Sequence, residues 1–321
     1  MRIAVCISGQ PRVSTVSLSS IKMFFLGKKP KESKVDFFIH TWDYINCNNI
    51  EENRKGFYVN PKQVQILLEK EFNPVKIQVE HWDPENAVDL QKPFLPGLYS
   101  LKRVISSWEE YSSETKVEYD WIFYTRLDTV RLLLDPPYNY QQLDWNSLPK
   151  PTEDRVTYRI DCSGIDRVSW AGERKHYIVG DFSWFASPAA AKVLKELYEF
   201  WNSVEKSLAL QEWIQSHLDL CGNEIWAAES RWAIYTVFTG IDCQVSLSYD
   251  VGWPVRLAVE QYDLTSPLGR KFLVEEIYKN EKGWFYTEDT VKSILDRKPE
   301  YRDLPRSTLL KRLRNEKSNL I

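Results

Sequence analysis

The 321-residue chain lacks the patterns that mark several large protein classes. Its 5 cysteines are scattered and form no CxxC pair, which disfavours a disulfide framework or a structural zinc site. No apolar stretch approaches the roughly 18 residues of a membrane-spanning helix, and the apolar run at residues 3–7 is too short for a signal peptide. With only 12 glycines and no low-complexity tract, wholesale disorder is not expected. We therefore expect a folded protein of a reducing, cytoplasmic compartment.

Catalytic signatures of the common hydrolases and nucleotide-binding enzymes are also missing. The chain contains no HExxH, GxSxG, Walker A or GxGxxG motif, which argues against zinc peptidases, α/β-hydrolases, P-loop NTPases and Rossmann dehydrogenases. Its histidines, at 40, 81, 176 and 217, do not have the spacing of metal ligands. The net charge of −3 is well mixed along the chain, so no basic stripe suggests a nucleic-acid partner.

Aromatic residues, in contrast, are abundant. The chain has 13 tryptophans and 17 tyrosines. One explanation is an aromatic core. The other is sugar binding, because the apolar face of a pyranose stacks on an aromatic ring.

Strand and helix patterns alternate through the first part of the chain. Short apolar runs predict strands, and amphipathic segments between them predict helices. The predicted strands are 2–7, 35–42, 75–82 and 120–125, and the predicted helices are 13–25, 61–72 and 96–111. Alternation of this kind predicts an α/β fold with a mostly parallel, Rossmann-like central sheet flanked by helices. Ligands of such sheets bind beyond the carboxyl ends of the strands.

The second part of the chain is less regular. We expect a loop at 43–60, a strand at 182–186, helices at 188–204 and 223–238, and a strand at 240–248. No linker or internal repeat is apparent. The expected organisation is one domain over 1–256, with a helical C-terminal extension over 257–321 packed on it.

Ser8, Gly9, Gln10 and Arg12 follow the first predicted strand and precede a helix. A glycine there allows close approach of the backbone to a ligand, and a helix N-terminus favours phosphate. Arg12 could add a bidentate contact to a diphosphate. The alternative is an ordinary strand-to-helix turn with a solvated arginine.

Arg126 and Asp128 follow the strand at 120–125. A carboxylate at this position suits Mg²⁺ or Mn²⁺, which need only one or two protein carboxylates when a diphosphate supplies other oxygens. Arg126 could share the work of such a cation or pair with Asp128. The alternative is a structural salt bridge at a strand end.

Further carboxylates are candidates for the chemical step. Asp181 precedes the strand near 182–186 and could act as a general base, bind a sugar hydroxyl or cap a turn. Glu224 and Glu229 lie five residues apart, so we expect only one of them to face a cleft. Solvent-exposed helix carboxylates are the alternative.

Five segments in order resemble a family of GT-A glycosyltransferases from bacterial surface-polysaccharide clusters, large viruses and phages. They are RIAVCISGQPR, VDFFIHTW, YDWIFYTRLDT after its helix, GDFSWFASPAAAKVL and GNEIWAAESRWAIYTVFTGID, and together they span about residues 2–256. The resemblance implies a GT-A-like fold, a nucleotide-sugar donor, Mn²⁺ or Mg²⁺, and transfer to a hydroxyl of a glycan or lipid-linked glycan.

The resemblance also assigns roles by position. Asp128 would bind the metal, Ser8, Gly9 and Arg12 would lie near the nucleotide, and Asp181 and Glu229 would face the donor sugar or acceptor. The chain departs from the family in having Arg126-Leu127-Asp128 where an Asp-x-Asp is usual, so Arg126 could replace part of the cation's function.

Two other functions are compatible with the sequence. A nucleotidyltransferase that makes nucleotide sugars would share the sheet, although it usually has a more glycine-rich first loop. A non-catalytic carbohydrate-binding protein would account for the tryptophans. The basic tail from residue 301 could contact an anionic membrane surface, or form a solvated terminal helix.

Overall fold

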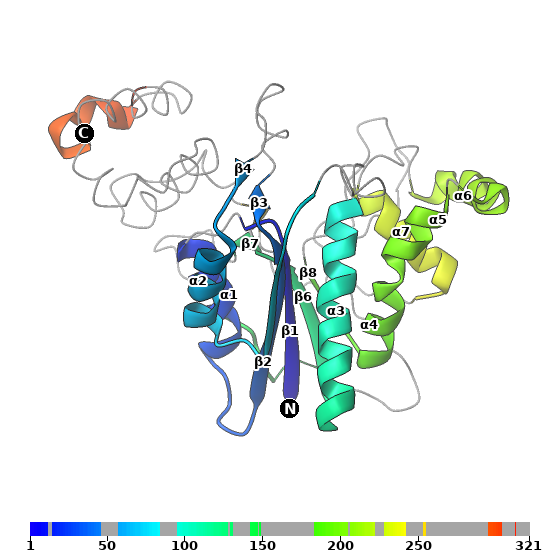
Figure 1. Cartoon of the computed structure of the whole chain (residues 1–321), viewed down its shortest axis with the longest axis horizontal. Coiled ribbons are helices and arrows are strands. Elements are labelled where there is room, and N and C mark those ends of the chain that lie inside the picture. The colour runs from blue at the N-terminus through cyan, green and yellow to red at the C-terminus, as the bar shows by residue number, and fades with distance from the viewer. Residues whose placement is uncertain are drawn as a thin grey trace.

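A five-stranded sheet lies between two layers of helices in the computed structural model (Figure 1). The structure describes residues 1–11, 15–45, 57–83, 95–127, 129–130, 142–146, 148, 183–204, 206–221, 228–241, 253–254, 295–303 and 312. Strands β1 (Arg2–Gly9), β2 (Lys34–Trp42), β5 (Lys76–Glu80) and β6 (Trp121–Arg126) are parallel, and β8 (Ser183–Ala186) runs antiparallel to β6. The order is β5-β2-β1-β6-β8. The predicted mostly parallel α/β sheet is thereby confirmed.

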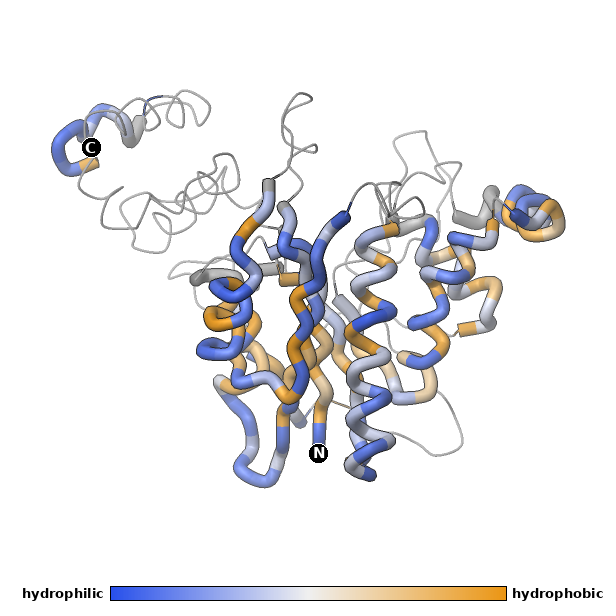
Figure 2. Tube along the Cα trace, in the orientation of Figure 1, coloured by the Kyte–Doolittle hydropathy of each residue, from blue (hydrophilic) through white to orange (hydrophobic). Residues whose placement is uncertain are grey.

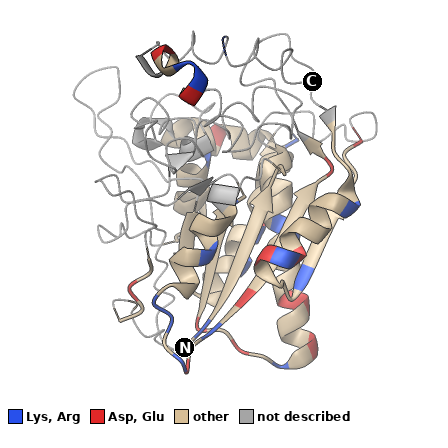
Figure 3. Cartoon of the chain, turned by 90° about the vertical axis from the view of Figure 1, so that its left-hand side faces the viewer, with Lys and Arg blue, Asp and Glu red and all other residues tan. Residues whose placement is uncertain are grey.

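Alternating side chains of each strand enter two hydrophobic cores. On one face, Ile3, Val5 and Ile7 of β1 pack with α1 (Thr15–Leu26) and α2 (Pro61–Phe72). On the other, Ala4 and Cys6 pack under α3 (Leu95–Thr115) and the helices that follow it. Figure 2 shows hydrophobic residues along the central strands and mixed colouring on the helices, while Figure 3 shows little charge within the strands. A sheet buried on both faces explains why its strands read as continuous apolar runs.

Helix α2 has the bounds that the sequence predicts, because both of its ends have local signals. Asn60 caps the first turn by accepting hydrogen bonds from the backbone N–H groups of Lys62 and Gln63, and Pro61 occupies the first helical position. At the other end, Asn73 adopts the left-handed conformation, with φ of 44°.

The predicted helix over 188–204 is instead two helices, α4 (Pro188–Lys195) and α5 (Leu197–Val204). At Glu196 the backbone N–H bonds to the carbonyl of Val193, three residues back, so the α-helical ladder is interrupted. Leu194 and Leu197, on either side of the interruption, both enter the core. Pro and Gly, the usual sequence signals of a helix break, are absent from positions 189–204.

Helix α6 (Leu208–Cys221), where the sequence predicts no element, packs beside α7 (Ala228–Thr239). Residues 223–227 of the predicted helix 223–238 lie outside the described residues. Gly240 and Ile241, expected to begin a strand, lie in no strand, and residues 242–248 are outside the described part.

Three short features complete the described structure. Strands β3 (Tyr44–Ile45) and β4 (Phe57–Tyr58) pair within the predicted loop 43–60, and β7 (Thr129–Val130) pairs with β9 (Trp253–Pro254). Near the C-terminus, residues 295–297 are helical and η3 (Pro299–Asp303) is a 3₁₀-helix. Most of the predicted extension over 257–321 lies outside the described residues. Among the described residues, no helix has both the length and the apolar character needed to cross a bilayer.

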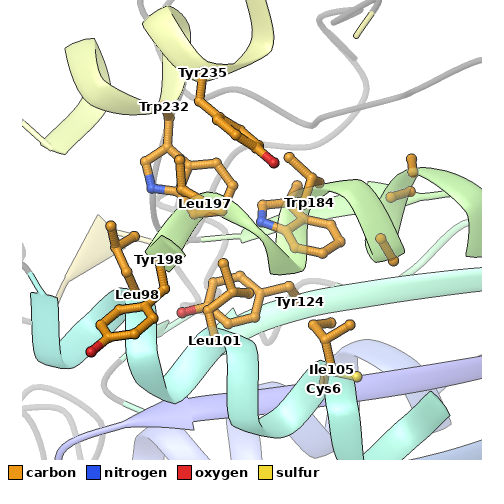
Figure 4. Packing of buried hydrophobic residues seen from close by; sticks show 14 of the residues in the cluster. Cys6, Leu98, Leu101, Ile105, Tyr124, Trp184, Leu197, Tyr198, Trp232 and Tyr235 are labelled. Atoms are coloured by element: carbon orange, nitrogen blue, oxygen red, sulfur yellow. The ribbon is translucent and has the colours of Figure 1, made fainter. Parts of the chain in front are cut away.

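The tryptophans favour the aromatic-core explanation. Trp184 is completely buried, its ring stacks on Tyr124 with centroids 5.3 Å apart, and Trp232 lies 6.2 Å from it (Figure 4). The other buried tryptophans are Trp42, Trp108, Trp121, Trp145 and Trp201. For these residues, tryptophan abundance reflects packing rather than an exposed sugar-binding surface.

Candidate functional site

The carboxyl ends of β5, β2, β1 and β6 meet at one edge of the sheet, as the sequence predicts for successive parallel strands. The chain moves from β1 to β2 on one side, whereas β6 pairs with β1 on the other. The strand order therefore reverses between β1 and β6. In open α/β sheets, the crevice at such a reversal is where ligands bind.

Gly9 ends β1 in a conformation that other residues avoid. Its φ is +119°, outside the narrow left-handed region that residues with a Cβ occupy. The turn is fixed from both sides, since Thr41 Oγ1 donates to the Gly9 carbonyl at 2.7 Å and the Leu127 N–H donates to the Ser8 carbonyl at 2.9 Å. The glycine thus turns the chain where it leaves the sheet, beside the end of β6.

Ser8 contributes to this edge through its backbone. Its side chain is fully buried on the α3 face, and its hydroxyl lies 3.0 Å from the Tyr124 hydroxyl, with either group able to donate. The expectation that Ser8 lies near the nucleotide stays a prediction. The Ser8 hydroxyl belongs to the core.

Gln10 and Arg126 flank the reversal point. Gln10 follows Gly9, and Arg126 is the register partner of Ser8 on β6; both side chains are half-buried. The structure thus brings together four of the predicted positions: Ser8, Gly9, Gln10 and Arg126.

The remaining predicted residues cannot be placed as side chains. Arg12, Asp128 and Asp181 lie outside the described residues. Glu229 is the second residue of α7, but its side chain is outside the described part.

A buried carboxylate and an exposed imidazole form a pair that the sequence analysis did not select. Asp43 follows β2 and is 7% exposed; its Oδ2 lies 2.6 Å from His81 Nδ1, and its Oδ1 accepts from the Trp82 N–H at 2.9 Å. The His81 side chain is 68% exposed. The hydrogen bond and charge of Asp43 raise the pKa of His81. Part of the signal was available: Asp43 directly follows the predicted strand 35–42, whereas His81 lies within the predicted strand 75–82, which in the structure ends at Glu80.

Tyr58 of the β3–β4 pair places its ring against one face of the His81 imidazole. Tyr58 stacks on His81 at a centroid distance of 5.4 Å and an interplanar angle of 19°, and its hydroxyl donates to the Trp82 carbonyl at 2.8 Å. Tyr44 stacks on Trp82 with centroids 6.1 Å apart. The imidazole is held by hydrogen bonding at one nitrogen and by stacking on one face.

A second histidine at the same edge is buried. His40 Nε2 lies 3.3 Å from Glu80 Oε2, and Arg103 Nη2 lies 2.8 Å from Glu80 Oε1. Burial lowers the pKa of His40 and outweighs the attraction of Glu80. Burial acts to raise the pKa of Glu80, but His40, Arg103 and Tyr99 together lower it. Because His40 is buried and its neutral form is favoured, we assign it a structural role beneath this edge of the sheet.

The opposite edge of the sheet is closed by one ion pair and the hydrogen bonds around it. Arg2 Nε donates to Asp36 Oδ2 at 2.6 Å, the Arg2 N–H donates to Asp120 Oδ2 at 2.6 Å, and the Tyr119 hydroxyl donates to the same Asp36 oxygen at 2.8 Å. These groups satisfy one another. Of the two edges, the one at the carboxyl ends of the parallel strands contains the Gly9 turn and the exposed His81, which a ligand can contact.

The described residues do not by themselves make a divalent-cation site. Among them, no group of three or more His, Cys, Asp or Glu side chains is arranged to hold a metal ion. Asp128, the predicted ligand, is outside the described part, so a site for Mn²⁺ or Mg²⁺ stays a prediction.

Comparison with known proteins gives no assignment: a scan against protein-family models and a search of curated proteins both found no match.

Proposed function

We propose that the chain is a glycosyltransferase that moves a sugar from a nucleotide-sugar donor to a hydroxyl of a glycan or glycoconjugate. The observation that supports this best is the turn at Gly9, whose positive φ lies at the carboxyl end of β1, beside β6 and its terminal Arg126. A backbone without a Cβ next to a cation suits a diphosphate, which needs close N–H donors and positive charge.

In this proposal the diphosphate lies between the ends of β1 and β6. Gly9 and Gln10 provide the backbone approach, and Arg126 and Arg12 offset the charge that develops on the departing diphosphate. A divalent cation at Asp128, if bound, would supply Lewis-acid neutralisation of the same charge. The anomeric carbon acquires oxocarbenium character as its bond to the phosphate oxygen breaks. A base removes the proton of the attacking hydroxyl, and Asp181 and Glu229 are the carboxylates proposed for it.

A thermal-shift screen with UDP-, GDP-, CMP- and dTDP-linked sugars, each with and without Mn²⁺, tests the proposal. We expect stabilisation by one nucleotide class and slow hydrolysis of that donor when no acceptor is present. Stabilisation by nucleoside triphosphate plus sugar phosphate, with formation of a nucleotide sugar, would instead show a nucleotidyltransferase. Glycan binding without any nucleotide effect would identify a carbohydrate-binding protein.

Asp128→Ala tests the assigned carboxylate, with Glu32→Ala as a control. Glu32 is exposed and lies two residues before the start of β2, at the opposite edge of the sheet. We expect Asp128→Ala to abolish both transfer and donor hydrolysis, whereas Glu32→Ala keeps both. Full activity of Asp128→Ala would remove Asp128 from the mechanism.

A further inference from the structure

The pair of His81 and Asp43 has the form of an oriented imidazole rather than of a surface ion pair. Asp43 is nearly inaccessible, and its two oxygens are used by His81 Nδ1 and by the Trp82 N–H. A carboxylate that accepts from Nδ1–H fixes the tautomer and leaves Nε2 as the outer nitrogen. Because the ring is 68% exposed, Nε2 is available to a ligand.

An aromatic ring beside the imidazole enlarges the surface that a ligand of His81 Nε2 can contact. Tyr58 is 49% exposed although it stacks on His81, and its ring is anchored through its hydroxyl to the Trp82 carbonyl. The Val59 N–H, next to Tyr58 in the chain, donates to the Asp43 carbonyl at 2.7 Å. The ring of Tyr58 and the imidazole are therefore held together by β2, β4 and the end of β5.

Charge around the imidazole decides which ligands are suitable. Asp43 and Asp83 both act electrostatically on His81, so two carboxylates face one ionisable imidazole. Among the described residues, these two carboxylates disfavour a phosphate beside His81. A neutral ring that carries hydroxyls meets no such repulsion. Its apolar face can pack on Tyr58, and one hydroxyl can bond to Nε2.

We infer that Asp43, Tyr58 and His81 form a binding subsite for a neutral, hydroxyl-bearing ring, with His81 Nε2 bonded to one ring hydroxyl. The inference rests on the proposed function and deepens it, since both substrates supply such a ring. The bound ring is either the pyranose of the acceptor glycan or the nucleoside of the donor. His81 follows β5, two strand spacings from β1, which is about 10 Å. The subsite is thus separate from the diphosphate position but within reach of one extended substrate.

The test uses neutral ligands, so that binding at the diphosphate position does not contribute. Full-length protein labelled with ¹⁵N-histidine is titrated with free nucleosides in one arm and with methyl glycosides in the other. The chain has 4 histidines, and the His81 signals are assigned by their loss in His81→Ala. The arm that shifts these signals saturably identifies which substrate supplies the ring.

Matched variants separate the subsite from general effects. Because His81→Ala has no His81 signal, calorimetric titration with the same neutral ligand gives the affinity of each variant. His81→Ala should weaken binding about tenfold, or about 1.4 kcal/mol, the size of one lost hydrogen bond. Tyr58→Leu should weaken it similarly, and Tyr58→Phe should bind more tightly than Tyr58→Leu. The control is His217→Ala, because His217 also stacks on an aromatic ring, that of Trp213 at 4.1 Å, but lies on α6. It should bind as wild type.

Two outcomes overturn the inference: no ligand of either arm shifts the His81 signals, or His81→Ala binds as tightly as His217→Ala. Failure of the proposed function would give a different set of results. In that case neutral ligands still bind through His81, while no nucleotide sugar stabilises or is hydrolysed by the wild-type chain. A protein that hydrolyses a nucleotide sugar but shows no His81 response would retain the function and lose the subsite.

Discussion

Replacing Gly9 with alanine measures how much the candidate diphosphate turn depends on its backbone conformation. An alanine Cβ would have space, because its nearest neighbour, the Leu127 nitrogen, would be 3.9 Å away. The cost is therefore conformational: holding a residue with a Cβ at a φ of +119° costs about 1–3 kcal/mol. The stiffer unfolded chain offsets about 0.4–1 kcal/mol of this. We expect a net loss of about 1–2 kcal/mol in the free energy of unfolding.

Urea unfolding monitored by tryptophan fluorescence gives this free energy, with Gly97→Ala as the control. Gly97 lies in the first turn of α3, has no atom within 4 Å of an added Cβ and has no strained φ. In Gly97→Ala the unfolded chain is stiffer and the folded state is not strained. This variant should therefore be neutral or more stable by up to about 1 kcal/mol. Equal unfolding free energies for Gly9→Ala and Gly97→Ala would refute the idea that Gly9 is required for its conformation. We also expect Gly9→Ala to weaken binding of the nucleotide that the thermal-shift screen selects.

Three further outcomes follow from the described contacts. Asp43→Asn should lower the pKa of His81 in a histidine NMR titration, because the charge and hydrogen bond of Asp43 raise it in the wild type; an unchanged pKa would show that the pair is not formed in solution. His40 should titrate below its ordinary pKa of 6.5, and since its folded-state pKa is lowered, it should reduce stability as the pH falls through about 6.5. His40→Asn should flatten that part of the stability–pH curve, and a curve identical to wild type would contradict a buried neutral His40. Trp184→Ala should cost about 3–5 kcal/mol in urea unfolding, because Trp184 is fully buried, and a loss below about 1 kcal/mol would be incompatible with its stacking on Tyr124.

The sheet could be predicted because its strands carry local signals. Residues 2–7, 35–42 and 120–125 are mainly apolar, as buried parallel strands require, and the structure places strands at all three. Helices α2 and α3 were predicted because an apolar stripe recurs with helical spacing, and Leu101 and Trp108 of that stripe are buried.

The missed features depend on tertiary contacts. The break at Glu196 has no Pro or Gly, so the local sequence does not mark its position. Helix α6 has a mixed surface, and its packing against α7 is long-range information. The β3–β4 pair is only two residues long on each strand, too short for a period-2 pattern to be recognised.

For the site, the sequence located the edge but selected only part of its chemistry. Gly9 and Arg126 follow apolar strands, and parallel pairing brings them together. Asp43 also follows such a strand, whereas His81 lies within the predicted strand 75–82, and 38 positions separate the two residues in the sequence. Their hydrogen bond depends on β2 and β5 being neighbours in the sheet, and the sequence of neither strand indicates that they are.

A crystal structure of the chain with the nucleoside diphosphate selected by the thermal-shift screen tests the central claim most directly. The account predicts that the diphosphate lies at the carboxyl ends of β1 and β6, with its oxygens within hydrogen-bond distance of the backbone N–H groups after Gly9 and of Arg126. A nucleotide bound at the amino ends of the strands, or on an outer helix face away from Gly9, would contradict it.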